Sequence, residues 1–132
     1  MSQYIIVIGC GRLGSLLASQ LSGAGHSVVA IDCNAQTFSS LSSEFSGFQI
    51  EGDATQIEVL ERAKITQADC LIAATSEDNV NLMVAQVAKE IFRVQRTIAR
   101  VFDPAREAIY REFGITTISP TQLAAEALLQ LV

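Results

Sequence analysis

Six short runs of apolar, mostly β-branched residues recur along this chain, and segments of helical periodicity separate them. Such continuous runs are typical of parallel strands covered on both faces by crossover helices, because every side chain of the strand is then buried. The expected strands are 4–8, 27–31, 47–51, 70–74, 97–101 and, with a weaker pattern, 116–118. The chain is therefore predicted to fold as an α/β domain with a parallel six-stranded sheet and helices on both faces.

The segments between the strands carry apolar residues at helical spacing. Two helices are predicted over 12–24 and 79–92, and we expect their apolar stripes to face the sheet. These stripes consist of Leu13, Leu16, Leu17, Ala18 and Leu21 in the first helix and of Leu82, Met83, Val87 and Ile91 in the second. A further helix is expected over 104–113, closed by Gly114, and a last one from Pro120.

The chain has 132 residues and shows no linker, low-complexity stretch or change of composition, so a single domain over residues 1–132 is expected. Its last predicted helix carries an apolar stripe formed by Leu123, Ala124, Ala127, Leu128 and Leu131. Two interpretations of this stripe stay open. Either the helix packs on its own sheet, or it packs on a second subunit or leads into a further domain.

Composition narrows the class of protein. No apolar run approaches the roughly 20 residues that cross a bilayer, and the N-terminus has no basic leader, so a soluble, unprocessed protein is expected. Nine basic against fourteen acidic side chains give a net charge of −5 without a basic stretch, which argues against nucleic acid as a partner. The three cysteines lack a CxxC spacing, which favours a reducing cytoplasmic setting and predicts no metal site.

The motif Gly9-Cys10-Gly11-Arg12-Leu13-Gly14 follows the first strand directly and opens the first helix. In this context the first glycine allows a tight turn, the second lets the backbone approach a pyrophosphate, and the third lets helix and strand pack closely. The helix start then offers free N–H groups and a partial positive charge to phosphates. The motif therefore predicts a Rossmann-type, doubly wound sheet and a phosphate site that includes Leu13. Arg12 is expected to contact phosphate, the alternative being a solvated arginine.

Asp32 ends the second strand, 18 positions beyond Gly14. A carboxylate at this place can accept hydrogen bonds from both ribose hydroxyls of an adenosine, and it would repel a 2′-phosphate. The sequence therefore favours NAD, ATP, ADP or AMP over NADP. Asn34 is expected to add a polar contact nearby.

Further candidate residues follow the other strands at the same edge of the sheet. Asp53, with Ala54 beside it, follows the third strand and is expected to hydrogen-bond the adenine amino group, to cap the next helix, or to do both. Thr75 closes the fourth strand near the topological switch point and is expected in the pocket wall. Arg100 interrupts an apolar strand, and a buried arginine needs an anion, either a ligand phosphate or a partner carboxylate.

Candidates for catalysis are weak. His26 is expected at the opposite edge of the sheet, and Tyr110 lacks the lysine four residues later that a tyrosine-based dehydrogenase needs. Neither a nucleophile elbow nor a P-loop lysine occurs in the sequence. We therefore predict a binding domain that is not an enzyme. The alternatives are the cofactor domain of an NAD-dependent oxidoreductase whose substrate domain lies elsewhere, and a nucleotide-stabilised dimerisation domain.

Together these motifs resemble the KTN family, also called RCK N-terminal or TrkA-N domains, the regulatory subunits of bacterial potassium channels and transporters. The resemblance spans nearly the whole chain. The motifs that carry it are Val7 to Gly14, Ile31-Asp32, Gly52-Asp53-Ala54-Thr55, Ala68-Asp69 to Thr75-Ser76 with Asp78-Asn79, Ile98 to Val101, and Ser119-Pro120.

The resemblance implies the strand order 3-2-1-4-5-6 and a homodimer whose last helix, from about residue 120, crosses onto the partner. It also implies assembly into a ring on the cytoplasmic side of the membrane, beneath a potassium channel or transporter subunit. An adenine nucleotide, NAD(H) or ATP/ADP/AMP, would regulate that ring. By resemblance, the loop with Arg12 holds phosphates, Asp32 the ribose and Asp53 the adenine side, while Arg100 faces ligand phosphates or the dimer cleft. The family's usual smaller C-terminal domain is not part of residues 1–132, and the expectation of a ring depends on it. Thr121 is not acidic, so the resemblance implies no metal site.

Overall fold

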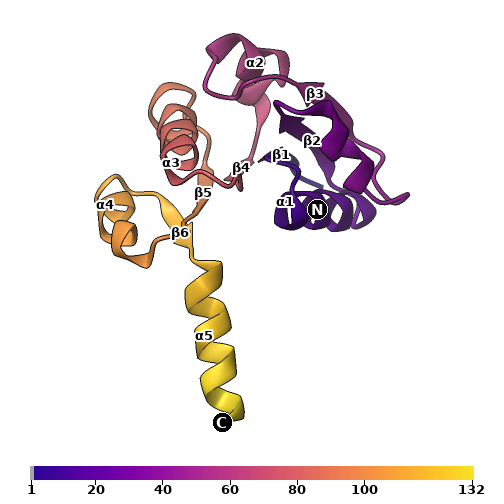
Figure 1. Ribbon diagram of the computed structural model, residues 1–132. Helices are drawn as coiled ribbons and strands as arrows, with labels where there is room; N and C mark the ends of the chain where they lie inside the picture. Colours follow the sequence, from indigo (N-terminus) through magenta and orange to yellow (C-terminus); the bar gives the residue numbers. More distant parts are fainter. Residues whose placement is uncertain (1) are drawn as a thin grey trace.

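A computed structural model describes residues 2–132. Six parallel strands form one sheet in the order β3-β2-β1-β4-β5-β6, which confirms the predicted fold class and strand order (Figure 1). The strands are β1 (Tyr4–Ile8), β2 (Ser27–Asp32), β3 (Phe48–Glu51), β4 (Cys70–Ala73), β5 (Arg96–Arg100) and β6 (Thr116–Ile118). Each lies within one residue of its predicted bounds. Continuous apolar runs identify β1, β2 and β4 well, because these strands are buried on both faces of the sheet. The edge strands β3 and β6 are largely exposed.

The helices follow the prediction less closely. They are α1 (Arg12–Gly23), α2 (Ile57–Arg62), α3 (Asp78–Gln86), α4 (Glu107–Glu112) and α5 (Pro120–Leu131). Short 3-10 segments are η1 (Ala35–Ser40), η2 (Ile65–Gln67) and η4 (Pro104–Arg106), and η3 (Val87–Ile91) is a π-helix. The predicted helix 79–92 therefore ends in a π-helix, and the predicted helix 104–113 begins as a 3-10 turn.

The sheet is covered by different helices on its two faces. Ile5, Val7, Val28 and Ala30 form one core cluster, which α1 covers with Ala18. The other face carries a core that joins residues of β1, β2 and β4 to buried residues of α2 and α3, among them Leu60 and Val84. Towards β5, Tyr110 of α4 closes a third cluster. The carboxyl ends of the strands, which these layers leave uncovered, are where a ligand can enter.

The predicted inward faces of two helices are confirmed only in part. Ala18 is buried, and Leu21, Leu82 and Val87 pack partly buried against the core. The side of α1 that is buried consists of Gly14, Ser15, Ala18, Ser19 and Ser22, whereas Leu16 is 55% exposed. In α3 the buried residues are Asn81, Val84 and Ala85, whereas Met83 is 50% exposed. Small side chains let these helices approach the sheet closely, so the leucine and methionine side chains are displaced to the flanks and the surface.

The buried serines of α1 have a structural role. The hydroxyl of Ser19 accepts the backbone N–H of Ser42 at 3.0 Å, and the hydroxyl of Ser22 accepts that of Ser46 at 2.9 Å. The connection between β2 and β3 is thus attached to α1 by hydrogen bonds, in addition to apolar contacts of Phe38.

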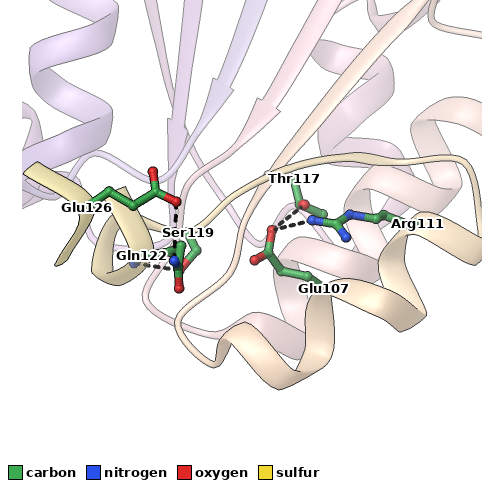
Figure 2. A network of polar contacts seen from close by, with 6 residues as sticks. All are labelled: Glu107, Arg111, Thr117, Ser119, Gln122 and Glu126. Carbon is green, nitrogen blue, oxygen red and sulfur yellow. Dashed lines mark hydrogen bonds and ion pairs between the residues drawn. The ribbon is translucent and has the colours of Figure 1, made fainter. Parts of the chain in front are cut away.

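The last helix stands away from the sheet (Figure 1). Figure 2 shows its start, where the Ser119 hydroxyl accepts the N–H of Gln122 at 3.2 Å, and the contact of α4 with β6, where Glu107 accepts the Thr117 hydroxyl at 2.7 Å. None of the residues of α5 is buried, and Leu128 is 63% exposed. The interpretation that this helix packs on its own sheet is therefore wrong.

No helix within residues 2–132 has both the length and the apolar character needed to cross a membrane.

Candidate functional site

A cavity of about 690 Å³ opens at the carboxyl ends of the strands, with its wall contributed by the segments that follow β1 to β5. The predicted site residues that line it are Gly9, Gly11, Arg12, Asp32, Asp53, Ala54, Thr75 and Arg100. Residues that are up to 91 positions apart, Gly9 and Arg100, are thus brought to one pocket. Leu13, Gly14 and Asn34 do not line it.

The three glycines of the loop differ in whether the fold requires glycine at their position. Gly9 has φ +95°, a left-handed conformation that favours glycine. A Cβ at Gly14 would lie 1.7 Å from the carbonyl oxygen of Gly9, so helix and loop pack too closely for any side chain. Gly11 has an ordinary extended backbone, and none of the described residues would lie within 4 Å of a Cβ there. The fold therefore requires glycine at two of these positions but not at Gly11.

The start of α1 is open to the cavity. Gly11 precedes the helix as its N-cap, and no side chain of residues 2–132 caps the first turn. The first N–H groups of a helix point out of its end and carry a partial positive charge. With the exposed Arg12 side chain next to them in the cavity wall, they form a site for an anion.

Asp32 connects β2 to the glycine loop. One carboxylate oxygen accepts the N–H of Cys10 at 2.8 Å, and the other accepts the N–H of Asn34 at 2.8 Å. A carboxylate oxygen can accept two hydrogen bonds, so each of these oxygens retains a free lone pair for a ribose hydroxyl. Asn34 itself caps η1, since its side-chain oxygen accepts the N–H of Gln36 at 3.0 Å.

Asp53 forms a turn with Thr55, not the cap of α2. Its Oδ1 accepts both the hydroxyl of Thr55 at 2.7 Å and the N–H of Thr55 at 2.9 Å, while the N-cap of α2 is Gln56. These hydrogen bonds, the hydroxyl first, lower the pKa of Asp53 below its ordinary value. The carboxylate is therefore charged at neutral pH, and its second oxygen can accept a hydrogen bond from an amino group.

Arg100 lies at the end of β5 with a polar atom that lacks a partner. Its guanidinium carbon is 4.2 Å from the ring centre of Phe102, a cation–π contact. Its Nε is buried and finds no hydrogen-bond acceptor among residues 2–132. Buried N–H groups are nearly always paired, so this group favours an anion in the cavity.

Some residues of the pocket were not selected from the sequence. Thr37, Glu77, Val80 and Phe102 also line the cavity, and Asn81 lies directly behind its wall. The segments that follow β4 and β5 come together only in the folded sheet, so their contribution was predicted only in part. A usable signal was the position of Phe102 just after a strand, the same position that identified Asp53.

The cysteines differ in accessibility. Cys33 is exposed and lines the cavity, whereas Cys10 and Cys70 are buried. Burial, and next the charge of Asp32, raise the pKa of Cys10 to about 12. Cys10 is therefore a neutral thiol at physiological pH.

The two residues that were considered and set aside as catalytic groups lie outside the cavity wall. His26 accepts the N–H of Gln3 through Nδ1 at 3.0 Å, at the amino end of β2. The hydroxyl of Tyr110 donates to the carbonyl of Asp78, and burial raises the pKa of that phenol. The cavity wall thus contains two arginines, Arg12 and Arg100, and three carboxylates, Asp32, Asp53 and Glu77. The arginines are suited to binding phosphate, and the carboxylates are suited to accepting hydrogen bonds from hydroxyl or amino groups.

Sequence comparison gives a match to a known family. The model of the TrkA-N domain matches residues 5–120. The Trk system potassium uptake protein TrkA of Streptomyces coelicolor is 37% identical over 127 residues, covering 96% of this chain and 57% of that protein. The corresponding TrkA homolog of Pyrococcus abyssi is 39% identical over 129 residues, covering 92% of this chain and 56% of that protein. The chain spans somewhat more than half the length of these relatives.

Solved structures show the same fold. The TrkA-N domain of the inner membrane protein ybaL from Escherichia coli superposes with a TM-score of 0.87 at 22% identity, covering 100% of this chain and 98% of that one. The Kef CTD of Shewanella denitrificans in its AMP-bound form gives 0.78 at 24% identity, covering 97% and 81%. The GsuK channel bound to NAD gives 0.73 at 20% identity, covering 89% and 21%. The TrkA-N model matches most of the chain, and this chain therefore belongs to the TrkA-N domain family.

Proposed function

We propose that this domain binds an adenine nucleotide, NAD(H) or ATP/ADP/AMP, and thereby regulates a membrane potassium channel or transporter. The observation that carries the proposal is Gly11, a glycine in the cavity wall for which the fold gives no steric reason. A ligand that approaches the backbone at the start of α1 supplies that reason. The names of the relatives support the regulatory role, since they are potassium uptake proteins. Two structures of the same fold carry AMP and NAD.

In this proposal the loop from Gly9 to Gly14, with the backbone of Leu13 and the side chain of Arg12, holds the phosphates. Asp32 accepts the ribose hydroxyls, and Asn34 maintains the turn that follows Asp32. Asp53 and Ala54 contact the adenine. Thr75 and Arg100 contact the part of the ligand beyond the first phosphate.

The domain then acts by binding rather than by turnover, at the cytoplasmic face of a membrane partner. A nucleotide shifts the gating equilibrium only by its difference in affinity for two conformations. Ligands that differ in charge at the phosphate end contact Arg12 and Arg100 differently, so this end of the cavity is suited to distinguishing them.

We further propose that the domain is a homodimer, and that dimers assemble into a ring. The leucines of α5 are exposed, and the side of β5 and β6 opposite α4 is incompletely covered, since Ile118 is 41% exposed. Ile118 pairs with Arg100 and Thr116 with Ile98, which places these four side chains on the face that α1 covers only further along the sheet. The α5 helix of a second copy is suited to cover that surface.

Isothermal titration of the purified domain with NAD, NADH, ATP, ADP and AMP at one salt concentration tests the nucleotide site. Submillimolar binding that Asp32→Ala weakens for every ligand is the expected result, because all of them contain the ribose. Absence of binding at millimolar ligand would overturn the proposal. Consumption of NADH in mixtures of candidate substrates would instead support the oxidoreductase alternative.

The regulatory role needs the whole protein. Deletion of the gene in its own host should change potassium uptake, and the full-length gene should restore it. A full-length gene carrying Gly11→Ala should restore the protein level but not the regulated uptake. Unchanged uptake after deletion would contradict a role in potassium transport and would leave nucleotide binding as a separate question.

A further inference from the structure

Asn81 uses every hydrogen-bonding position of its side chain within the protein. Its Oδ1 accepts the N–H of Thr75 at 2.9 Å and the hydroxyl of Thr75 at 2.6 Å. Its Nδ2 donates to the carbonyl of Thr75 at 3.0 Å and to the carbonyl of Arg100 at 3.0 Å. The side chain is fully buried and does not itself line the cavity. It therefore acts on the site only through the residues that it holds.

Thr75 and Arg100, the two residues that Asn81 binds, lie just beyond the last paired residues of β4 and β5. The pairing of β4 with β5 ends at Ala73 and Ala99. Thr75 and Arg100 follow this last pair, and both line the cavity. Beyond this last pair, the side chain of Asn81 in α3 connects the two strands by its hydrogen bonds to Thr75 and Arg100, and it thereby fixes the distance between the two strand ends.

Asp78, in the first turn of α3, binds the segment that follows β5 as well. The carboxylate of Asp78 accepts the N–H of Phe102 at 2.7 Å and the N–H of Asp103 at 3.2 Å. The ring of Phe102 in turn contacts the Arg100 guanidinium. The first two turns of α3 therefore hold Arg100 at both ends. Asn81 binds its carbonyl, and Asp78 binds the backbone of Phe102, whose ring contacts its guanidinium.

The order of the strands determines which cavity residues lie on each side of the glycine loop. Asp32 ends β2 and Asp53 follows β3 on one side of the glycine loop, whereas Thr75 follows β4 and Arg100 ends β5 on the other side. A nucleotide whose ribose meets Asp32 and whose first phosphate meets the start of α1 directs its remaining groups towards Thr75 and Arg100. These groups are the further phosphates of ATP or the second nucleoside of NADH.

We propose that Asn81 is a positioning residue of this pocket, which sets the affinity for the part of a nucleotide beyond its first phosphate by holding Thr75 and Arg100 in place. The proposal rests on the proposed nucleotide-binding function. It separates the pocket into a half that recognises adenosine monophosphate and a half that depends on Asn81.

Titrations with ATP and with AMP test this division. Asn81→Leu removes all four hydrogen bonds. Asn81→Asp retains an acceptor for Thr75 but loses both donations, to the carbonyls of Thr75 and Arg100. Both variants are expected to raise the Kd for ATP by about tenfold and the Kd for AMP by less than about twofold, because a misplaced guanidinium loses a charge-assisted hydrogen bond. NADH in place of ATP should show the same direction.

Val84→Ala is the matched control. Val84 lies one turn further along α3, is fully buried and belongs to an apolar core cluster, so its truncation lowers stability without removing a hydrogen bond to Thr75 or Arg100. It should leave the ratio of the two Kd values unchanged. Circular dichroism and melting temperature establish that each variant is folded at the titration temperature, and Asn81→Asp is the variant with the smaller structural change.

Three results would overturn the proposal. Both Asn81 variants could lose affinity for ATP and AMP by the same factor, they could lose none, or the wild-type domain could bind ATP no more tightly than AMP. Failure of the proposed function has a different signature, because the wild-type domain then binds neither ligand.

Discussion

Gly9, Gly11 and Gly14 occupy one motif, yet only two of them are demanded by the fold. Gly9 has a left-handed backbone, and Gly14 has no room for a methyl group. Gly11 has neither restriction. The motif predicts a different role for each glycine. The structure agrees for the turn at Gly9 and for the close packing at Gly14, and at Gly11 it leaves open space.

Gly11→Ala should therefore affect binding without affecting folding. The added methyl group meets open space in the protein but blocks the approach of a phosphate, so nucleotide affinity should fall by about tenfold or more while the melting temperature changes by less than about 2 °C. Titration calorimetry and differential scanning calorimetry measure the two effects. Gly14→Ala is the contrasting variant, and it should lower the free energy of unfolding by about 3 kcal/mol. Unchanged affinity in folded Gly11→Ala would refute the ligand explanation.

Cys33 offers a second test at the scale of one residue. It is exposed in the cavity wall, whereas Cys10 and Cys70 are buried with raised pKa values. A thiol reagent at pH 8 should therefore modify one cysteine rapidly in the folded protein, and a bound nucleotide should slow that reaction. Spectroscopic thiol counting with and without ATP measures this. Rapid modification that persists in a Cys33→Ser variant would show that another thiol is the reactive one.

Among the elements, strands were predictable from the sequence and helix orientations were not. Strands β1, β2 and β4 are largely buried, so their apolar runs are unambiguous, whereas the edge strands β3 and β6 are largely exposed and are recognised by their β-branched and aromatic residues. In α1 and α3 the predicted apolar stripe and the buried face differ, because Ser19 and Asn81 face inwards. A polar residue is buried only where partners exist, and those partners, Ser42 for Ser19 and Thr75 for Asn81, belong to other parts of the chain. Periodicity within one helix contains no information about them.

The candidate site was predictable to a similar extent. Residues that directly follow β1, β2 and β3 were identified because motifs mark them. Phe102 and Glu77 carry no motif, and their place in the cavity depends on how the ends of β4 and β5 are attached to α3.

The exposed helix α5 leads to a prediction about association. Leu128 is 63% exposed in the single chain, so Leu128→Glu should leave the fold intact, but it would place a charge in the proposed dimer interface. We expect it to raise the dimer Kd by about tenfold or more, measured by sedimentation velocity over a range of concentrations. Gln130→Glu adds the same charge to an already polar exposed position and is the control. A wild-type domain that is monomeric at high concentration would contradict the proposal for α5.

At the scale of the whole molecule, buried ionisable groups predict how stability depends on pH. Burial raises the pKa of Cys10, Cys70, Tyr4 and Tyr110 in the folded state. Above about pH 8.5, the ordinary pKa of a thiol, the unfolded chain loses protons that the folded chain keeps. The free energy of unfolding should therefore be pH-independent with respect to these groups below that pH and should fall as pH rises towards 12.

Urea denaturation between pH 7.5 and 10.5 measures this dependence. Cys10→Ala should make the free energy of unfolding fall less steeply with rising pH, since it removes a thiol whose pKa is raised to about 12 in the folded state. Val28→Ala truncates another buried side chain of the same cluster, so it should lower stability at every pH without changing the slope. Equal slopes for Cys10→Ala and the wild type would contradict the assignment.

The serines on the buried side of α1 have a consequence for motion. The segment from η1 to the start of β3 contains no fully buried residue, and two of its backbone N–H groups attach it to the helix by donating to the hydroxyls of Ser19 and Ser22. Segments with so little buried surface open locally at low cost, so their amide hydrogens exchange early. Thr37 of this segment lines the cavity next to Asp32. A ligand in the cavity should therefore order this weakly protected segment, and its binding should slow amide exchange between residues 35 and 46.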